Sequence, residues 1–88
     1  MTGSVCWSSH AWEDYCYWQT TDKRICKRIN ALITATMRTP FEGEGKPEPL
    51  RFQLAGLWSR RITAEHRLVY AWNADTRTLI ILQCRYHY

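Results

Sequence analysis

The sequence has no long hydrophobic run and lacks several motifs that mark common functional sites. No apolar stretch approaches the roughly 18 residues that span a membrane, so we expect no membrane segment. The chain also has no glycine-rich phosphate loop, no nucleophile-elbow pattern, no internal repeat and no low-complexity segment. These absences argue against the sites that such motifs build.

Paired cysteines and metal-binding spacings are lacking as well. The four cysteines are far apart, form no Cys-x-x-Cys pair and follow no secretory leader: Cys6, Cys16, Cys26 and Cys84. We therefore expect reduced thiols in a cytoplasmic protein, with two disulfides as the alternative. His10, His66 and His87 have no ligand spacing with carboxylates or cysteines, so we expect no metal and no other cofactor.

Acidic residues become scarce after residue 48. Residues 1–48 contain six Lys/Arg and six Asp/Glu, whose charges cancel. Residues 49–88 contain six arginines and only two acidic residues, Glu65 and Asp75, which accounts for the net charge of +4. Arginine's planar guanidinium suits bidentate contact with phosphate oxygens. This imbalance favours a polyanionic partner, although a solvated basic face without a partner is the alternative.

The length and the aromatic content indicate one small domain. With 88 residues, we expect residues 1–88 to form a single domain that buries about 60 to 65% of the surface of its unfolded chain. Five Trp, five Tyr and two Phe supply large side chains for such a core.

Two helices are predicted in the first half, after a short strand over residues 5–8. Ser8 or Ser9 can cap the first helix, whose inward positions are expected at Trp12, Tyr15, Cys16 and Gln19. The second helix should begin near Asp22 and end before Pro40, with one stripe formed by Ile25, Ile29, Leu32 and Thr36.

A sheet is predicted in the second half, after a loop over residues 39–49 that contains three prolines and two glycines. The apolar period then changes to two, which indicates strands over residues 50–54, 57–63, 66–72 and 78–87, with a hairpin turn at 73–77. The expected fold is α+β, with the helices on one face of a twisted antiparallel sheet.

Alternation along these strands separates an apolar face from a cationic face. The face toward the helices should hold Leu50, Phe52, Leu54, Trp58, Ile62, Leu68, Tyr70, Trp72, Ile80, Leu82, Cys84 and Tyr86. The open face should hold Arg51, Gln53, Ser59, Arg61, Thr63, Arg67, Gln83, Arg85 and His87. Arg60 falls on the apolar side, which predicts either a sheet edge or a slip of register.

Three kinds of residue on or near the open face could cut RNA. Glu48 lies between Pro47 and Pro49, which stiffen the backbone around its carboxylate. His87 can act as an acid near neutral pH, and arginines can stabilise a pentacovalent phosphate. Attack by a 2′-hydroxyl needs a base, a positive charge and an acid, and these residues supply one of each. The alternatives are that Glu48 is an exposed loop glutamate without a function and that His87 is a terminal histidine without a function.

Several ordered segments resemble the YoeB/Txe toxins of the RelE superfamily over nearly the whole chain. They are Trp-Glu-Asp-Tyr at 12–15, Tyr-Trp-Gln at 17–19, Arg-Thr-Pro-Phe-Glu-Gly at 38–43, Gly-Lys-Pro-Glu-Pro-Leu at 45–50, Gly-Leu-Trp-Ser-Arg-Arg-Ile-Thr at 56–63, Glu-His-Arg-Leu-Val-Tyr-Ala at 65–71 and Cys-Arg-Tyr-His-Tyr at 84–88. The resemblance implies a RelE-like fold of order β-α-α-β-β-β-β and a metal-independent endoribonuclease that cuts mRNA in the ribosomal A site.

The resemblance also implies roles for single residues. Glu48 would be the general base, Arg67 would stabilise the transition state and His87 would be the general acid. The implied supporting RNA contacts are Arg51, Arg61 and Tyr88, and we expect Lys46 and Arg85 to contact RNA as well. Many relatives have lysine at the position of Arg51, so this contact keeps its charge but not its shape.

Partners follow from the same resemblance: a Phd/YefM-type antitoxin with an acidic tail, the ribosome with its mRNA, and a second copy of the chain in a homodimer. Two other functions remain open at this point. The chain could be a non-catalytic module that binds RNA or an antitoxin, or a ParE-like inhibitor of DNA gyrase, which would not need Glu48 and His87.

Overall fold

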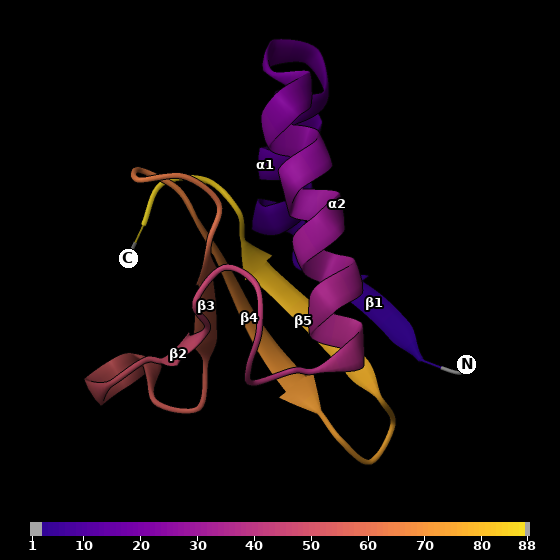
Figure 1. The fold of residues 1–88 in the computed structure, drawn as a ribbon, viewed down its shortest axis with the longest axis vertical. Helices are drawn as coiled ribbons and strands as arrows, with labels where there is room; N and C mark the ends of the chain where they lie inside the picture. The colour runs from indigo at the N-terminus through magenta and orange to yellow at the C-terminus, as the bar shows by residue number, and fades with distance from the viewer. Residues whose placement is uncertain (1–2, 88) are drawn as a thin grey trace.

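The structure, a computed structural model, describes residues 3–87 and consists of a helical hairpin packed on one face of a five-stranded sheet (Figure 1). The elements in chain order are β1 (Ser4–Trp7), α1 (Ser9–Thr21), α2 (Lys23–Arg38), β2 (Glu48–Pro49), the 3-10 helix η1 (Phe52–Leu54), β3 (Trp58–Arg61), β4 (Arg67–Asn73) and β5 (Thr78–Gln83). The predicted α+β class and the predicted order of strands and helices are confirmed.

The sheet has the strand order β1-β5-β4-β3-β2, so the first and last strands of the chain are neighbours. Neighbours among β2 to β5 are antiparallel, but β1 runs parallel to β5, with Ser4 opposite Thr78. The sheet is therefore mixed, and the prediction of a purely antiparallel sheet is wrong at this edge. Alternation identifies a strand, but it does not identify the partner or the direction when the two segments come from opposite ends of the chain.

The helix boundaries follow the predicted caps. The Ser8 hydroxyl accepts a hydrogen bond from the Ala11 amide at 3.0 Å, and the Asp22 carboxylate accepts one from the Arg24 amide at 3.0 Å. The stripe predicted for α2 is also confirmed, since Ile29 and Leu32 are fully buried. Within residues 3–87, no helix is long and apolar enough to cross a membrane.

The inward face of α1 differs from the prediction. Ala11, Asp14 and Trp18 are the buried residues, whereas Trp12 is 49% exposed. Hydrogen bonds to Cys84 explain why this face turns inward. The Asp14 carboxylate accepts a hydrogen bond from the Cys84 amide at 3.0 Å, and the Trp18 indole donates one to the Cys84 carbonyl at 2.9 Å. A hydrophobic pattern does not point to a buried carboxylate, because its partner lies at the far end of the chain.

The strand predicted over residues 50–54 is wrong. β2 is limited to Glu48–Pro49, and the chain then turns through η1, where the Leu54 amide donates to the Arg51 carbonyl at 3.0 Å. Phe52 has a φ of +56° and is 87% exposed, although alternation placed it toward the helices. Prolines lack the amide that extends a ladder, which accounts for a short strand here.

A bulge reverses the predicted faces of β5. Leu79 and Ile81 are fully buried, although the prediction placed Ile80 and Leu82 toward the helices. Tyr70 pairs with Ile81, but the next pair is Val69 with Gln83, so Leu82 is an extra residue in β5. One extra residue shifts the side chains on one side of it to the opposite face of the sheet. Cys84, which follows the bulge, is therefore buried as predicted, although Ile80 and Leu82 are not the inward residues of β5.

Arg60 lies neither at a sheet edge nor at a register slip. It is fully buried on β3, between β2 and β4, and its guanidinium donates to the carbonyls of Thr39, Glu42 and Glu44. It also donates to the Tyr70 hydroxyl at 3.3 Å, and that hydroxyl donates to the Pro40 carbonyl at 2.6 Å. Burial raises the pKa of Tyr70, although the hydrogen bond and charge of Arg60 oppose part of this shift. Arg60 therefore organises the loop that leads to β2.

All four cysteines are free, and they differ in accessibility. Cys84 is fully buried, and burial, followed by the nearby charges of Asp14 and Cys26, raises its pKa to about 12. Because the thiolate is the reactive form, we expect iodoacetamide at pH 8 to alkylate exposed Cys6 and to spare Cys84 in the folded protein. Mass spectrometry of tryptic peptides measures both, and equal labelling would contradict the buried position of Cys84.

Candidate active site

The register of three neighbouring strands brings a carboxylate and two guanidinium groups to the sheet face away from the helices. Glu48 on β2 is opposite Ser59 on β3, and Arg61 is two residues further along β3 on the same face. Arg61 is in turn opposite Arg67 on β4. The predicted open face is therefore confirmed for these positions of β3 and β4.

These side chains line one small cavity of about 100 Å³, formed by Lys46, Glu48, Ser59, Arg61 and Arg67, which we call the cationic pocket. Its lining carries three positive charges and one carboxylate, so the pocket attracts anions. Lys46, Glu48 and Arg61 are exposed and Arg67 is half-buried, so a ligand can reach all of them from solvent.

Arg61 and Arg67 carry like charges at directly opposite positions of neighbouring strands, and the Glu48 carboxylate lines the same pocket. Like charges directly opposite one another on neighbouring strands destabilise a sheet. An anion between the two guanidinium groups would remove this repulsion and accept hydrogen bonds from both. The arrangement thus suits a phosphodiester with Glu48 beside it.

Gly45 holds the segment that carries Lys46 and Glu48 close to α2 and β3. Its carbonyl accepts a hydrogen bond from the Arg61 amide at 2.7 Å, and its φ is +84°. A Cβ at this position would lie 2.8 Å from Leu32 Cδ2, so α2 and β3 leave no room for a side chain. Residue 45 must therefore be glycine for β2 to lie where it does.

Gly45→Ala should lower the free energy of unfolding by more than Gly56→Ala. Both glycines have positive φ, which costs about 1 to 2 kcal/mol for alanine. Only Gly45 is also packed, since nothing lies within 4 Å of a Cβ at Gly56, and overpacking adds about 1 to 3 kcal/mol. Urea unfolding of the two variants measures the difference. Equal losses would show that the contact with Leu32 does not fix this segment.

Arg51 and Arg85 do not line the cationic pocket. Arg51 is exposed and lines a neighbouring cavity of about 520 Å³ that runs from Glu48 to Leu54. Arg85 was predicted on the open face, but its guanidinium lies over the Tyr17 ring of α1, 3.6 Å from the ring centre. β5 ends at Gln83, so alternation does not extend to residue 85. Tyr88 lies outside the described residues.

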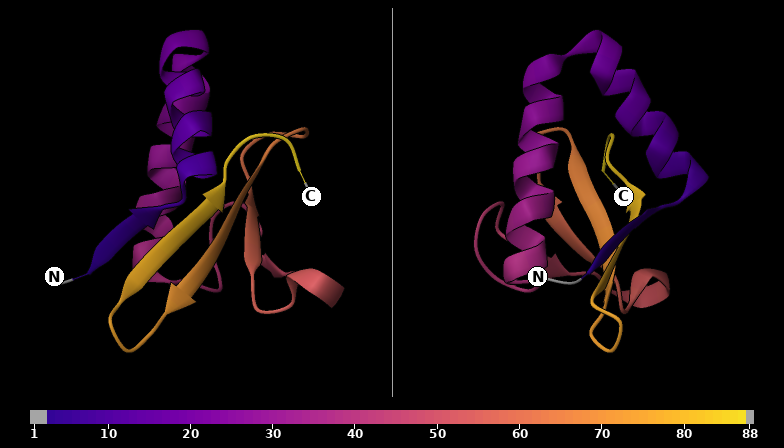
Figure 2. Two further views of the ribbon diagram at one scale, coloured as in Figure 1. Left: turned by 180° about the vertical axis from the view of Figure 1, so that it is seen from behind. Right: turned by 90° about the vertical axis from the view of Figure 1, so that its right-hand side faces the viewer.

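His87 belongs to the C-terminal tail, residues 84–87. The tail turns over the end of the sheet beside the β3–β4 connection and ends on the side away from the helices (Figures 1 and 2). His87 is exposed and is not among the residues that line the cationic pocket. The structure thus brings Lys46, Glu48, Arg61 and Arg67 together in one pocket, and His87 is not among the residues that line it.

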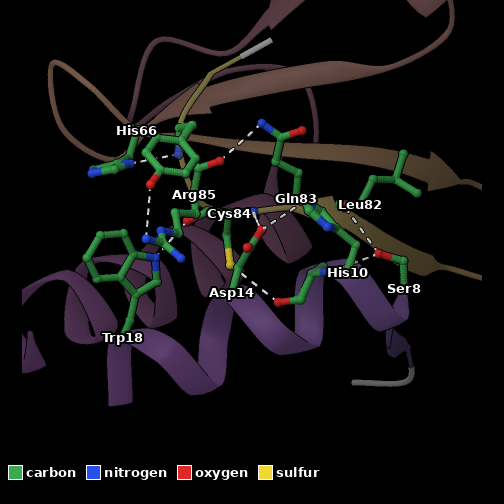
Figure 3. Close-up of polar contacts among 11 residues, drawn as sticks. Ser8, His10, Asp14, Trp18, His66, Leu82, Gln83, Cys84 and Arg85 are labelled. Atoms are coloured by element: carbon green, nitrogen blue, oxygen red, sulfur yellow. Dashed lines mark hydrogen bonds and ion pairs between the residues drawn. The ribbon is translucent and has the colours of Figure 1, made fainter. Parts of the chain in front are cut away.

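Three residues that the sequence analysis did not select hold this tail (Figure 3). Asp14 and Trp18 bind the backbone of Cys84, and His66 Nδ1 accepts the Tyr86 amide at 2.7 Å. The available signals were the helical spacing of Asp14 with Ala11 and Trp18 and the position of Asp14, Trp18 and His66 within segments that resemble the family. Among residues 3–87, no group of three or more His, Cys, Asp or Glu side chains could hold a metal ion.

Comparisons with known proteins agree on one family. Residues 7–88 match the family described as "YoeB-like toxin of bacterial type II toxin-antitoxin system". The chain is 66% identical to the toxin YoeB of Escherichia coli strain K12 over 82 residues, which cover 93% of this chain and 95% of that protein.

Solved structures agree with the sequence match. A YoeB/ParE toxin from Agrobacterium tumefaciens superposes with a TM-score of 0.94 at 52% identity, covering 97% of this chain and 99% of the other. The YoeB dimer from Staphylococcus aureus gives 0.91 at 43% identity, with both chains covered completely. The heterotetrameric YoeB–YefM complex from the same organism gives 0.89 at 43% identity, again with complete coverage of both chains.

Proposed function

The chain belongs to the YoeB-like toxins of bacterial type II toxin–antitoxin systems, and on this premise we propose that it is a ribosome-dependent endoribonuclease that cleaves mRNA in the A site. The observation that carries the proposal is the cationic pocket, where one carboxylate and three cations meet on the open face. A phosphodiester in this pocket has a base and stabilising charges within one small cavity.

In the proposed mechanism Glu48 is the general base. Its carboxylate takes the proton of the 2′-hydroxyl, and that oxygen then attacks the adjacent phosphorus. Arg67 stabilises the negative oxygens of the pentacovalent phosphate, with Arg61 and Lys46 as supporting cations in the same pocket. No metal or other cofactor takes part.

His87 is the proposed general acid. It protonates the 5′-oxygen as that oxygen leaves, so the products are a 2′,3′-cyclic phosphate and a 5′-hydroxyl. The course of the tail, which ends on the open side of the sheet, supports this role (Figure 2). We propose Arg51 and Arg85, which do not line the cationic pocket, as further RNA contacts, and Tyr88 as well.

We also propose the partners of this chain. An antitoxin of the YefM type would neutralise it in the cytoplasm, as suggested by the relative that is solved as a YoeB–YefM complex. An acidic antitoxin segment would complement the excess of arginine after residue 48. A homodimer is proposed from the relative that is solved as a dimer.

The direct test adds the antitoxin-free protein to ribosomes programmed with a defined mRNA and maps the mRNA ends. We expect a cut in the A-site codon that leaves a 2′,3′-cyclic phosphate and a 5′-hydroxyl. The same mRNA without ribosomes serves as the control and should be cut far more slowly. Arrest of translation with intact mRNA would instead identify a non-catalytic binding module, and inhibition of DNA gyrase would identify a ParE-like gyrase inhibitor.

A further inference from the structure

His66, which directly precedes β4, and Arg67, which begins β4, hold both polar groups of the Tyr86 backbone. The Tyr86 amide donates to His66 Nδ1 at 2.7 Å, and the Tyr86 carbonyl accepts from the Arg67 amide at 2.8 Å. A backbone amide can only donate, so Nδ1 carries a lone pair and no proton in this contact. The His66 imidazole thus serves as the acceptor for the Tyr86 amide, the role that a backbone carbonyl plays in a strand pair.

Tyr86 needs such a partner because its backbone conformation is unfavourable. Its φ is +61°, in the left-handed region, which costs a residue with a side chain roughly 1 to 2 kcal/mol. Strained residues persist where their surroundings fix them. Here the His66 ring also packs edge-on against Trp18, with centroids 4.7 Å apart, and lies 5.6 Å from the Tyr86 ring.

The rest of the tail is tied to α1 and to the last residue of β5, whose Gln83 side-chain amide donates to the Arg85 carbonyl at 3.1 Å. Asp14 and Trp18 hold the amide and the carbonyl of Cys84, and the Arg85 guanidinium lies over Tyr17 (Figure 3). These contacts stop at residue 85. The direction in which the chain leaves toward His87 is therefore decided at Tyr86, by His66 and Arg67.

Arg67 connects this contact to the cationic pocket. Its backbone holds the Tyr86 carbonyl, while its side chain lines the pocket with Glu48. From these contacts we propose that His66 is a positioning residue, which holds the Tyr86 amide and thereby sets the distance of His87 from the phosphate in the cationic pocket. The inference rests on the proposed function, since it assumes that His87 is the acid.

The experiment compares His66→Ala with His66→Asn in single-turnover cleavage on programmed ribosomes. Alanine removes the acceptor, whereas the asparagine side-chain oxygen can lie near the position of Nδ1 and accept the same hydrogen bond. A misplacement of about 1 Å can cost about 100-fold in rate, so we expect His66→Ala to lower the maximal rate by about 10- to 100-fold. The ribosome concentration at half-maximal rate should stay within about threefold, and His66→Asn should recover most of the rate.

A double-variant comparison tests whether His66 acts through His87. If it does, His66→Ala should cost little once His87→Ala is already present, because the acid to be positioned is gone. Losses that multiply would overturn the proposal. So would equal impairment of the alanine and asparagine variants, or a changed half-maximal concentration with an unchanged maximal rate.

Two further results keep the inference separate from folding and from the proposed function. If His66→Ala does not fold, ¹⁵N NMR of the unaltered protein decides. An Nδ1 that carries the proton of the neutral imidazole would refute the contact, and so would an unprotonated Nδ1 that shows no coupling across the hydrogen bond to the Tyr86 amide. If the unaltered protein does not cut mRNA on ribosomes, the proposed function fails. If it cuts and the His66 variants cut equally well, only the positioning role fails.

Discussion

Glu48→Gln should lower the rate of mRNA cleavage on programmed ribosomes by about 100- to 10,000-fold, the usual contribution of a positioned general base. Glutamine has nearly the same size and keeps an acceptor oxygen, but it cannot take the proton of the 2′-hydroxyl. Glu48 is exposed on the two-residue strand β2, so the substitution should leave the fold intact. Single-turnover cleavage measures the loss, and thermal unfolding verifies the fold.

Glu42→Gln is the matched control for this prediction. Glu42 is an exposed carboxylate in the same loop, and it does not line the cationic pocket. Its removal changes the net charge by the same amount, so we expect a change in rate of less than about threefold, within the small effect of an exposed charge. Equal losses in the two variants would indicate a general charge effect, and undiminished cutting by Glu48→Gln would remove Glu48 as the base.

Arg60→Met should lower the free energy of unfolding by about 2 to 4 kcal/mol, because several partly buried carbonyls lose their donor at once. For a domain of this size each kcal/mol shifts the melting temperature by about 4 to 8 °C, so we expect a fall of roughly 10 to 25 °C. Calorimetry or circular dichroism measures it. The loop that carries Glu48 should loosen first, which faster amide exchange at residues 39–46 would reveal.

Arg61→Met is the matched control for this prediction, because the two arginines are consecutive in the sequence but only Arg60 is buried. Arg60 is fully buried, whereas Arg61 is exposed and lies opposite Arg67. Removing Arg61 relieves a repulsion between like charges, so stability should stay the same or rise slightly while cleavage weakens. A stable Arg60→Met variant would show that the loop is held by other contacts.

Much of the fold was predictable because it depends on local signals. Ser8 and Asp22 are helix-capping residues, and each begins a helix as predicted. The stripe of α2 also agrees with the structure, since Ile29, Leu32 and Thr36 are buried. Alternation placed Arg61 and Arg67 on the open face together with Arg51 and Arg85, and the family resemblance, not the pattern, implied the roles of Glu48 and Arg67.

Other features were not predictable because they depend on a partner distant in sequence or on one inserted residue. Leu82 is an extra residue in β5, and a period of two carries no information about such an insertion. The inward Asp14 depends on the Cys84 amide, and the exposed Phe52 depends on a turn that prolines impose upstream. Arg85 departs from the open face because the strand ends before it.

The sequence by itself determined the helices, most of the strands, the excess of arginine and the residues able to act as base, cation and acid, because composition, caps and periodicity are local properties of the chain. Only the tertiary structure decided which of these residues meet. Register across β2, β3 and β4 brings Glu48, Arg61 and Arg67 into one pocket, and the buried Arg60 and the packed Gly45 hold the loop that makes this possible. Pairing between strands and the satisfaction of buried polar groups depend on contacts between segments far apart in the chain, so no local pattern specifies them.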